Sequence, residues 1–243
     1  MLLKTRGIVF RSIKYGETSV IADIYTEERG LHTFIAGGVR SAKARMPFGL
    51  FQPMTVVDMV SYFKEETGGM HRLKEMRADE VFQSTPFDVR RGAVALFMAE
   101  VCRKSIHEAE ENRDLFQFLL HYLRWLDSTA HPLPNLHLHF LLGLSEHLGF
   151  QPDGELDSEG GQIFDLKEGA FLAEAPHDHL HYLSAPDTRH LLQLLQVPVE
   201  EAHTVSIDRA ARKSLLHGLI RFYQYHLPGF TEVNTPEVLD MVF

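Results

Sequence analysis

Residues 7–36 read GIVFRSIKYGETSVIADIYTEERGLHTFIA, and this stretch decides the fold. It holds three short runs rich in β-branched and aromatic residues, separated by turn-forming segments around Gly16 and Gly30. Such runs with glycine-marked turns are typical of β-strands joined by hairpins. In the first run, strict alternation would place Val9 on the same face as Arg11, opposite Phe10.

Two more strand-like runs follow, at residues 54–63 and 70–82, with Gly68-Gly69 as the hairpin signal between them. Five short strands at intervals of about ten residues predict a small sandwich or barrel. An OB-type barrel has five strands, and a segment of this length suits it. We therefore expect residues 1–82 to form an OB-type domain.

After Pro86 the apolar period changes from two to that of a helix, with Val89, Ala93, Phe97 and Val101 on one face. The sequence predicts an all-α domain over residues 83–243, interrupted by an acidic, glycine-rich insertion at 151–183. The fold class is thus α+β, with a two-stranded excursion expected within the insertion. Helices are expected at 88–106, 113–126, 136–148, 188–196 and 206–227, the last with Ser206 as its N-cap.

Charge is unevenly distributed along the chain. The 243 residues contain 33 acidic and 24 basic side chains, for a formal net charge of −9. The first 80 residues hold 12 basic and 10 acidic residues, whereas the remainder holds 12 and 23. The predicted barrel is therefore the cationic part, which is where an anionic partner such as nucleic acid would bind.

The sequence lacks the common catalytic signatures and any long apolar run. It has no phosphate-binding glycine loop, no nucleophile elbow and no zinc-protease motif. The single cysteine, Cys102, excludes an internal disulfide and is expected to be a small buried hydrophobe. Without a secretory signal or a membrane-length segment, we expect a cytoplasmic, nucleoid-associated protein that does not bind membranes.

Residues 37–49, GGVRSAKARMPFG, carry Arg40, Lys43 and Arg45 and no acid. Cations beside aromatic side chains are the usual means of holding single strands without sequence preference. We expect this loop to contact phosphate, helped by Arg11, Lys14 and Arg29, with Tyr15 and Phe48 as stacking residues. Other cations of the barrel are Arg6, Arg72, Lys74 and Arg77, and Tyr25 and Phe34 are either further stacking residues or core.

The N-terminal pattern closely resembles the RecO family of bacterial recombination mediators. The matching motifs are the strand and turn of residues 7–17, the turn at 26–30, the basic loop at 38–45 and the segment Leu50–Pro53. Looser similarity continues through the helices to the last one, LIRFYQYHLPGF. The resemblance implies an N-terminal OB fold and a C-terminal helical domain.

The resemblance also implies a function without covalent chemistry. Members of the family bind single- and double-stranded DNA and anneal complementary strands. With RecR, and in some settings RecF, they help load RecA onto strands coated by the single-strand-binding protein SSB, whose acidic C-terminal tail they contact. Cations that could edge a site for this tail are Arg90, Arg91, Arg103, Lys104, Arg124, Arg209, Arg212 and Lys213, and the sequence does not say which of them converge.

One departure from the family concerns zinc. Many members carry a four-cysteine zinc module where this chain has residues 151–183, which contain no cysteine. We therefore expect no cofactor. His177, His179 and His181 would point the same way in a strand and could form a substitute site. Two alternatives stay open: a protein-interaction scaffold whose barrel does not bind DNA, and a histidine-dependent metalloenzyme.

Overall fold

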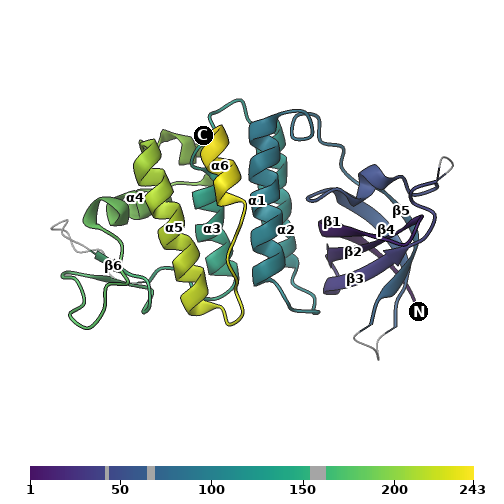
Figure 1. Ribbon diagram of the computed structural model, residues 1–243, viewed down its shortest axis with the longest axis horizontal. Helices are drawn as coiled ribbons and strands as arrows, with labels where there is room; N and C mark the ends of the chain where they lie inside the picture. Colours follow the sequence, from purple (N-terminus) through teal and green to yellow (C-terminus); the bar gives the residue numbers. More distant parts are fainter. Residues whose placement is uncertain (42–43, 65–68, 154–162) are drawn as a thin grey trace. The chain divides into compact units, whose positions relative to one another are not determined.

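The computed structural model describes residues 1–41, 44–64, 69–153 and 163–243. Its first five strands close into a barrel in the order β1-β2-β3-β5-β4, with β1 and β4 paired to complete the circle (Figure 1). All pairs are antiparallel except β3 with β5. The predicted five-stranded barrel is confirmed. Its strands are β1 (Leu2–Tyr15), β2 (Ser19–Thr26), β3 (Gly30–Ala36), β4 (Val56–Tyr62) and β5 (His71–Ala78).

The barrel interior is filled by alternate side chains from these strands. Val20, Ala22 and Ile24 of β2 point inward and are almost fully buried, as the alternation predicts. Phe34 of β3 and the 3₁₀ helix η1 (Phe48–Phe51) add aromatic rings to the same core. Phe34 is therefore a core residue and cannot stack on a base.

A β-bulge at Phe10 changes which side chains in the last part of β1 point into the barrel and which point out of it. Val9 pairs with Ile24 and Arg11 with Asp23, so Phe10 is an extra residue without a partner on β2. Val9 consequently belongs to the core, while Arg11 is exposed. The expectation that Val9 and Arg11 share a face is wrong, because strict alternation fails where a bulge inserts one residue.

The described chain forms two compact units that are not continuous in sequence. The first contains Met1–Asp88 and Met98–Ser128, and the second contains Val89–Phe97 and Thr129–Phe243. In the first unit, Tyr25 packs against Phe116 at 6.3 Å between ring centroids, and its hydroxyl donates to the carbonyl of Asn112. Tyr25 is therefore buried and cannot stack on a base. The domain boundary at residue 82 stays a prediction.

Helices follow the barrel in the predicted order, and none in the described ranges is long and apolar enough to cross a membrane. The prediction of Ser206 as an N-cap is wrong: Asp208 caps the long C-terminal helix, accepting a hydrogen bond from the amide of Ala211. The α-helices are α1 (Val89–Ser105), α2 (Arg113–Ser128), α3 (Leu136–His147), α4 (Ala185–Leu195), α5 (Arg209–His226) and α6 (Pro236–Val242), with the 3₁₀ helix η2 at Val199–Thr204.

The polar insertion contains the expected two-stranded element, β6 (Ile163–Asp165) paired antiparallel with β7 (Ala170–Leu172). His177, His179 and His181 do not form a strand with a common face. His179 instead lies 3.3 Å from the buried carboxylate of Asp165 and stacks on His181. Among the residues that the structure describes, no cluster of histidine, cysteine or acidic side chains could hold a metal ion.

Candidate nucleic-acid interface

The basic loop is anchored to the barrel by two apolar side chains. Val39 and Met46 are buried in the barrel core at either side of the loop. Gly38, with a φ of +72°, allows the left-handed backbone that the turn requires. Arg40 and Arg45 lie next to these anchors and are exposed, whereas Lys43 lies outside the described residues. The two buried anchors therefore fix the points at which the side chains of Arg40 and Arg45 reach solvent.

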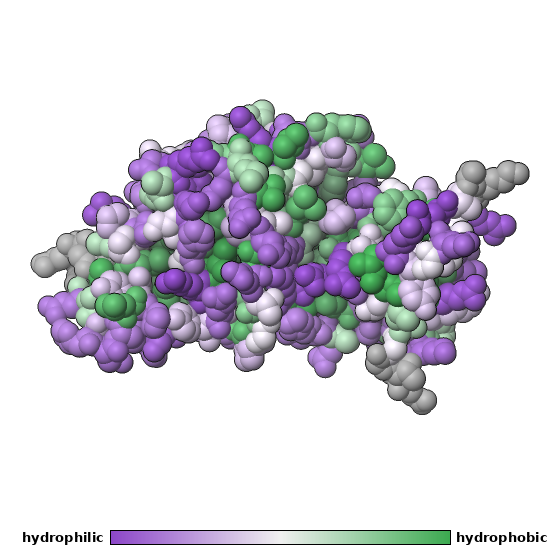
Figure 2. Space-filling view, viewed as in Figure 1, coloured by the Kyte–Doolittle hydropathy of each residue, from purple (hydrophilic) through white to green (hydrophobic). Residues whose placement is uncertain are grey.

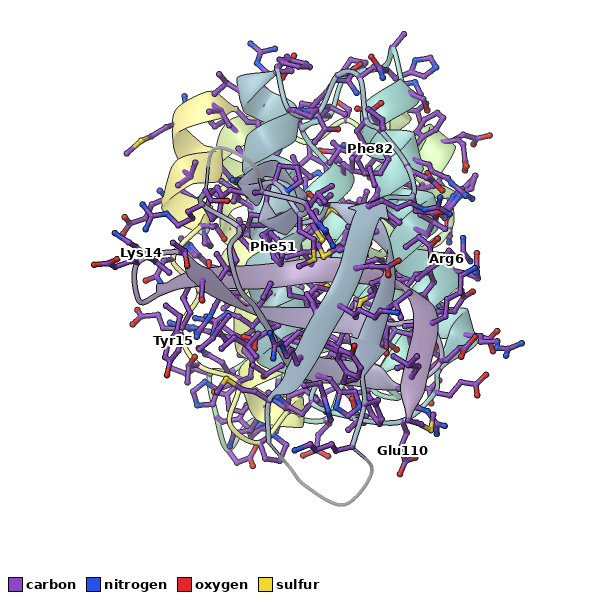
Figure 3. The ribbon with its side chains drawn as sticks, turned by 90° about the vertical axis from the view of Figure 1, so that its right-hand side faces the viewer. Arg6, Lys14, Tyr15, Phe51, Phe82 and Glu110 are labelled. Atoms are coloured by element: carbon purple, nitrogen blue, oxygen red, sulfur yellow. The ribbon has the colours of Figure 1, made fainter. Side chains whose placement is uncertain are left out.

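Hydrogen bonds join this loop to the turn between β1 and β2. The amide of Arg40 donates to the carbonyl of Thr18 at 3.3 Å, and its guanidinium donates to the carbonyl of Glu17 at 3.2 Å. The loop therefore lies beside the end of β1, where Lys14 and Tyr15 are exposed. Figure 3 shows Lys14 and Tyr15 at one edge of the barrel and Arg6 at the opposite edge.

We use the name loop face for the exposed loop residues Arg40, Arg45 and Phe48 together with Arg11, Lys14 and Tyr15 of the strand end that leads to the turn bonded by Arg40. The Arg11 guanidinium lies 3.5 Å from the Asp23 carboxylate and remains partly exposed. Tyr15 and Phe48 are 52% and 44% exposed, so both rings are available to stack. The loop face thus presents cations and aromatic rings to solvent.

Arg29, which the sequence groups with the loop, lies elsewhere. It follows Thr26, at the opposite end of β2 from the strand end that pairs with Ala36. At about 3.3 Å per residue, the two ends of β2 are roughly 20 Å apart. Arg29 instead stands over the Phe63 ring at 6.0 Å, a distance at which a cation–π attraction operates.

Arg29 lines a groove of about 940 Å³ that the sequence does not reveal. His32 and His71 meet in this groove, with 3.3 Å between Nδ1 and Nε2. Burial lowers the pKa of both imidazoles below the ordinary histidine value. The two histidines are far apart in sequence, and their meeting depends on β3 pairing with β5. The remaining lining residues are Asp23, Leu31, Thr33, Phe63, Lys64, Gly69, Met70, Arg103 and Ala109.

Two barrel cations are held by acids and are poorly placed for phosphate. The Arg6 guanidinium donates two hydrogen bonds to Glu27, at 2.8 and 2.7 Å, which raises the pKa of Arg6. Arg77 donates two to Asp58, at 3.1 and 2.7 Å. The Arg6–Glu27 pair is bidentate and occupies the guanidinium fork that would otherwise bind a phosphate, whereas both Arg77 hydrogen bonds go to one oxygen of Asp58.

Comparison with known proteins matches both parts of the chain. Residues 1–82 match the family model described as "Recombination protein O N terminal", and residues 86–232 match "Recombination protein O C terminal". The chain belongs to the RecO family. Proteins called DNA repair protein RecO are similar over their full length and that of this chain: 35% identical in Bacteroides fragilis, 33% in Flavobacterium psychrophilum and 32% in Phocaeicola vulgatus. Membership in RecO accounts for the barrel followed by helices.

In the second unit, three of the cations considered above for contact with the SSB tail line the same pocket. Arg209, Arg212 and Lys213 of α5 line one small pocket, beside His137, Leu216, Leu239, Asp240 and Phe243. Burial lowers the pKa of Arg212, and burial lowers that of His137 to about 3, so His137 is neutral at pH 7. The pocket therefore combines cationic side chains with an apolar wall. Two of the cations already have partners: Lys213 pairs with the carboxylate of Asp240, and Arg212 donates to the Ile207 carbonyl at 2.9 Å.

Two further candidates are likewise engaged within their own units. Lys104 lies 3.1 Å from Glu100, and Arg124 donates to Glu80.

Cys102 is fully buried, and burial raises the pKa of its thiol, which disfavours the reactive thiolate. The prediction of Cys102 as a packed hydrophobe is confirmed. Figure 2 shows hydrophilic side chains over much of the visible surface, with apolar ones in small areas between them.

Proposed function

We propose that this protein is a non-enzymatic recombination mediator that binds single- and double-stranded DNA and anneals complementary strands. The observation that carries the proposal is the loop face, a set of exposed cations and rings on the basic loop and the adjoining strand end of a barrel of the RecO type. Cations supply affinity by releasing counterions from phosphates, and exposed rings add base stacking. Arg40 and Arg45 are the central phosphate contacts in this proposal, with Lys43 beside them in sequence.

Partners follow from the same family relationship. We propose that the protein acts with RecR, and in some settings RecF, to help load RecA onto SSB-coated DNA in the cytoplasm. The α5 pocket supports a contact with the SSB tail, since its cations suit acidic residues and its apolar wall suits an apolar peptide end.

The decisive experiment measures strand annealing and oligonucleotide binding for the double variant Arg40→Glu and Arg45→Glu. We expect binding to weaken at least tenfold and annealing to be lost, because four units of charge change on the loop face. The matched control is Lys4→Glu with Lys74→Glu, which makes the same charge change at exposed barrel positions outside the loop face.

An unchanged affinity in the Arg40 and Arg45 variant would contradict the assignment of the loop face. If the wild-type protein showed no salt-dependent binding of DNA at all, the interaction-scaffold alternative would replace the mediator function. Thermal unfolding of each variant shows whether a loss of binding reflects a loss of fold.

A further inference from the structure

Positive charge collects in the groove that contains His32 and His71. Three side chains that are charged at neutral pH line it from separate segments: Arg29 from the turn before β3, Lys64 from just after β4, and Arg103 from the last turn of α1. All of them belong to the first compact unit. A concave surface lined by one sign of charge concentrates the potential and attracts ions of the opposite sign.

Acidic side chains near this groove do not offset its charge. Among the lining residues that the structure describes, Asp23 is the one carboxylate. It accepts a hydrogen bond from Thr33 at 2.9 Å and lies 3.5 Å from the Arg11 guanidinium. Glu108 lies on the segment that borders the groove and acts on Tyr25, since burial and this carboxylate together raise the pKa of Tyr25. The groove therefore keeps an excess of positive charge.

Hydrogen bonds fix the positions of the hydrogens in the histidine pair. The backbone amide of Lys64 donates to Nδ1 of His71 at 3.4 Å, so the hydrogen of neutral His71 is on Nε2. That hydrogen points to Nδ1 of His32 at 3.3 Å, which places the hydrogen of His32 on Nε2, near the Arg29 carbonyl. The Phe63 ring stacks on His71 with 4.1 Å between the ring centroids. Both imidazoles are thus neutral members of one hydrogen-bonded chain.

The cations of the groove help to keep this pair uncharged. Burial lowers the pKa of both imidazoles, and the guanidinium of Arg29 lowers that of His32 further. The charges of His32 and Lys64 lower the pKa of His71 in the same way. Among the described residues that act on the pair, the charged groups are therefore cations, and an anion bound in the groove would reverse their effect.

We propose that the groove binds a phosphate monoester dianion, with Arg29, Lys64 and Arg103 as its ionic contacts. Such a group carries close to two negative charges at pH 7 and three acceptor oxygens, whereas a phosphate within a strand carries one charge. A volume of about 940 Å³ also leaves room for the molecule that bears the phosphate. Arg29 and the basic loop lie at opposite ends of β2, so this site is separate from the loop face and does not depend on it.

The histidine pair would couple binding of this anion to proton uptake. A proton can be added only at Nδ1 of either ring, since that atom is the acceptor in both. Its addition breaks one hydrogen bond of the chain and supplies a further N–H for the phosphate oxygens. A nearby dianion favours the charged imidazole, so binding should raise the pKa of His32 and His71. Affinity should then rise as the pH falls through the raised values.

Imidazole NMR on the isotope-labelled full chain tests this coupling. The titrations of His32 and His71 are compared in inorganic phosphate and in chloride at equal ionic strength, so that general screening is the same. We expect phosphate to raise both midpoints by about one pH unit. Arg29→Gln with Arg103→Gln should remove the difference between the two salts.

The matched control is Lys4→Gln with Lys74→Gln, which removes the same charge from exposed barrel positions outside the groove. It should keep the full effect of phosphate. Thermal unfolding shows whether each variant folds. If the arginine variant does not, Lys64→Gln alone, at an exposed position, should still reduce the effect of phosphate by about half.

Two sources of a phosphate monoester are distinguished by the ligand that is added. A nucleoside monophosphate that raises both midpoints as inorganic phosphate does would identify a free nucleotide. An oligonucleotide with a 5′ phosphate that binds at least threefold more tightly than its 5′-hydroxyl counterpart would identify the end of a strand, provided that Arg29→Gln with Arg103→Gln removes the advantage. Either result supports the inference.

Equal midpoints in phosphate and in chloride would overturn the inference, as would failure of both the nucleotide and the phosphorylated strand. An equal rise with polyglutamate would assign the groove to an acidic peptide and overturn it too. Arg40→Glu with Arg45→Glu should keep the effect of phosphate on the two histidines. The outcome for this groove is therefore distinguishable from the outcome for the proposed function.

Discussion

Gly30, in the turn between β2 and β3, shows how closely the chain approaches itself at single residues. Its φ of +67° suits glycine, and a Cβ placed there would lie 2.4 Å from the Glu110 carbonyl oxygen and 2.5 Å from that of Glu108. Glycine is needed at this turn for two reasons. It adopts the left-handed backbone, and the absence of a side chain leaves room for the segment that precedes α2. The amide of Leu31 donates to the Glu108 carbonyl at 2.9 Å, which holds that segment in place.

We expect Gly30→Ala to destabilise the protein by about 3 kcal/mol, because a left-handed alanine costs about 1–2 kcal/mol and the carbonyl clash forces a backbone shift. Gly16→Ala is the matched control, since Gly16 has a φ of +60° and open space around the added Cβ. Gly16→Ala should lower the free energy of unfolding by about 1 kcal/mol. Urea unfolding measures both, and equal losses would contradict the close-approach argument.

At the scale of elements, α2 is joined to the chain that leaves the barrel through one carboxylate. Asp127 near the end of α2 accepts hydrogen bonds from the amides of Gln83, Ser84 and Thr85 at 2.7–2.9 Å. Partial burial opposes ionisation, but the three amide donors outweigh it and hold the pKa of Asp127 below its ordinary value. The ionised carboxylate therefore stabilises the native state.

We expect Asp127→Asn to lower the free energy of unfolding by about 1 kcal/mol at pH 7. Because the native pKa is depressed, the stabilisation is fully present above the unfolded-state pKa of about 4 and is lost as the pH falls through the native value. The difference between wild type and variant should therefore shrink below about pH 4. Urea unfolding across this range measures it, and a difference independent of pH would contradict the role of the charge.

Elements were predictable to the extent that they follow a simple period. The barrel strands and the helices α1, α2 and α3 appear where alternation and helical spacing indicate, because a buried face repeats along each element. The bulge at Phe10 was not predictable, since Phe10 suits an ordinary strand position equally well. The same holds for the N-cap of α5, where Ser206 and Asp208 are both good caps and the backbone chooses Asp208.

The candidate site was predictable in part for a similar reason. Arg40 lies beside the end of β1 because the basic loop is hydrogen-bonded to the turn that follows this strand, which is close in sequence. Arg29 differs because its distance from the loop depends on the length of β2, and His32 meets His71 through a pairing of β3 with β5. Contacts set by long-range pairing leave no local pattern in the sequence.

At the scale of the whole molecule, the chain carries two chemically distinct candidate surfaces in two compact units. The loop face lies in the first unit, and the α5 pocket lies in the second. The net charge of −9 comes chiefly from residues beyond the barrel. Acidic surroundings repel DNA, which would confine phosphate contacts to the barrel and leave the α5 pocket to a peptide.

We therefore expect binding of DNA and of the SSB tail to be separable. Arg209→Glu with Lys213→Glu should weaken binding of an SSB-tail peptide about tenfold and leave oligonucleotide binding unchanged. Arg40→Glu with Arg45→Glu should weaken oligonucleotide binding at least tenfold and leave binding of the SSB-tail peptide unchanged. Anisotropy with labelled peptide and labelled oligonucleotide measures both, and loss of both activities in either variant would contradict two independent surfaces.

The bulge in β1 has a consequence for comparing relatives within the family. Side chains alternate between the inside and the outside of the barrel along a strand. The extra residue at Phe10 shifts this alternation by one residue, so the parts of β1 before and after the bulge follow opposite patterns. A relative lacking this one residue would regain strict alternation and keep Arg11, Ile13 and Tyr15 outward, whereas a relative that kept the residue and lost the bulge would turn them toward the barrel interior. A single-residue gap at this point therefore preserves the outward side chains, whereas an ungapped relative without the bulge would lose them, and identity alone does not reveal which relatives keep this face.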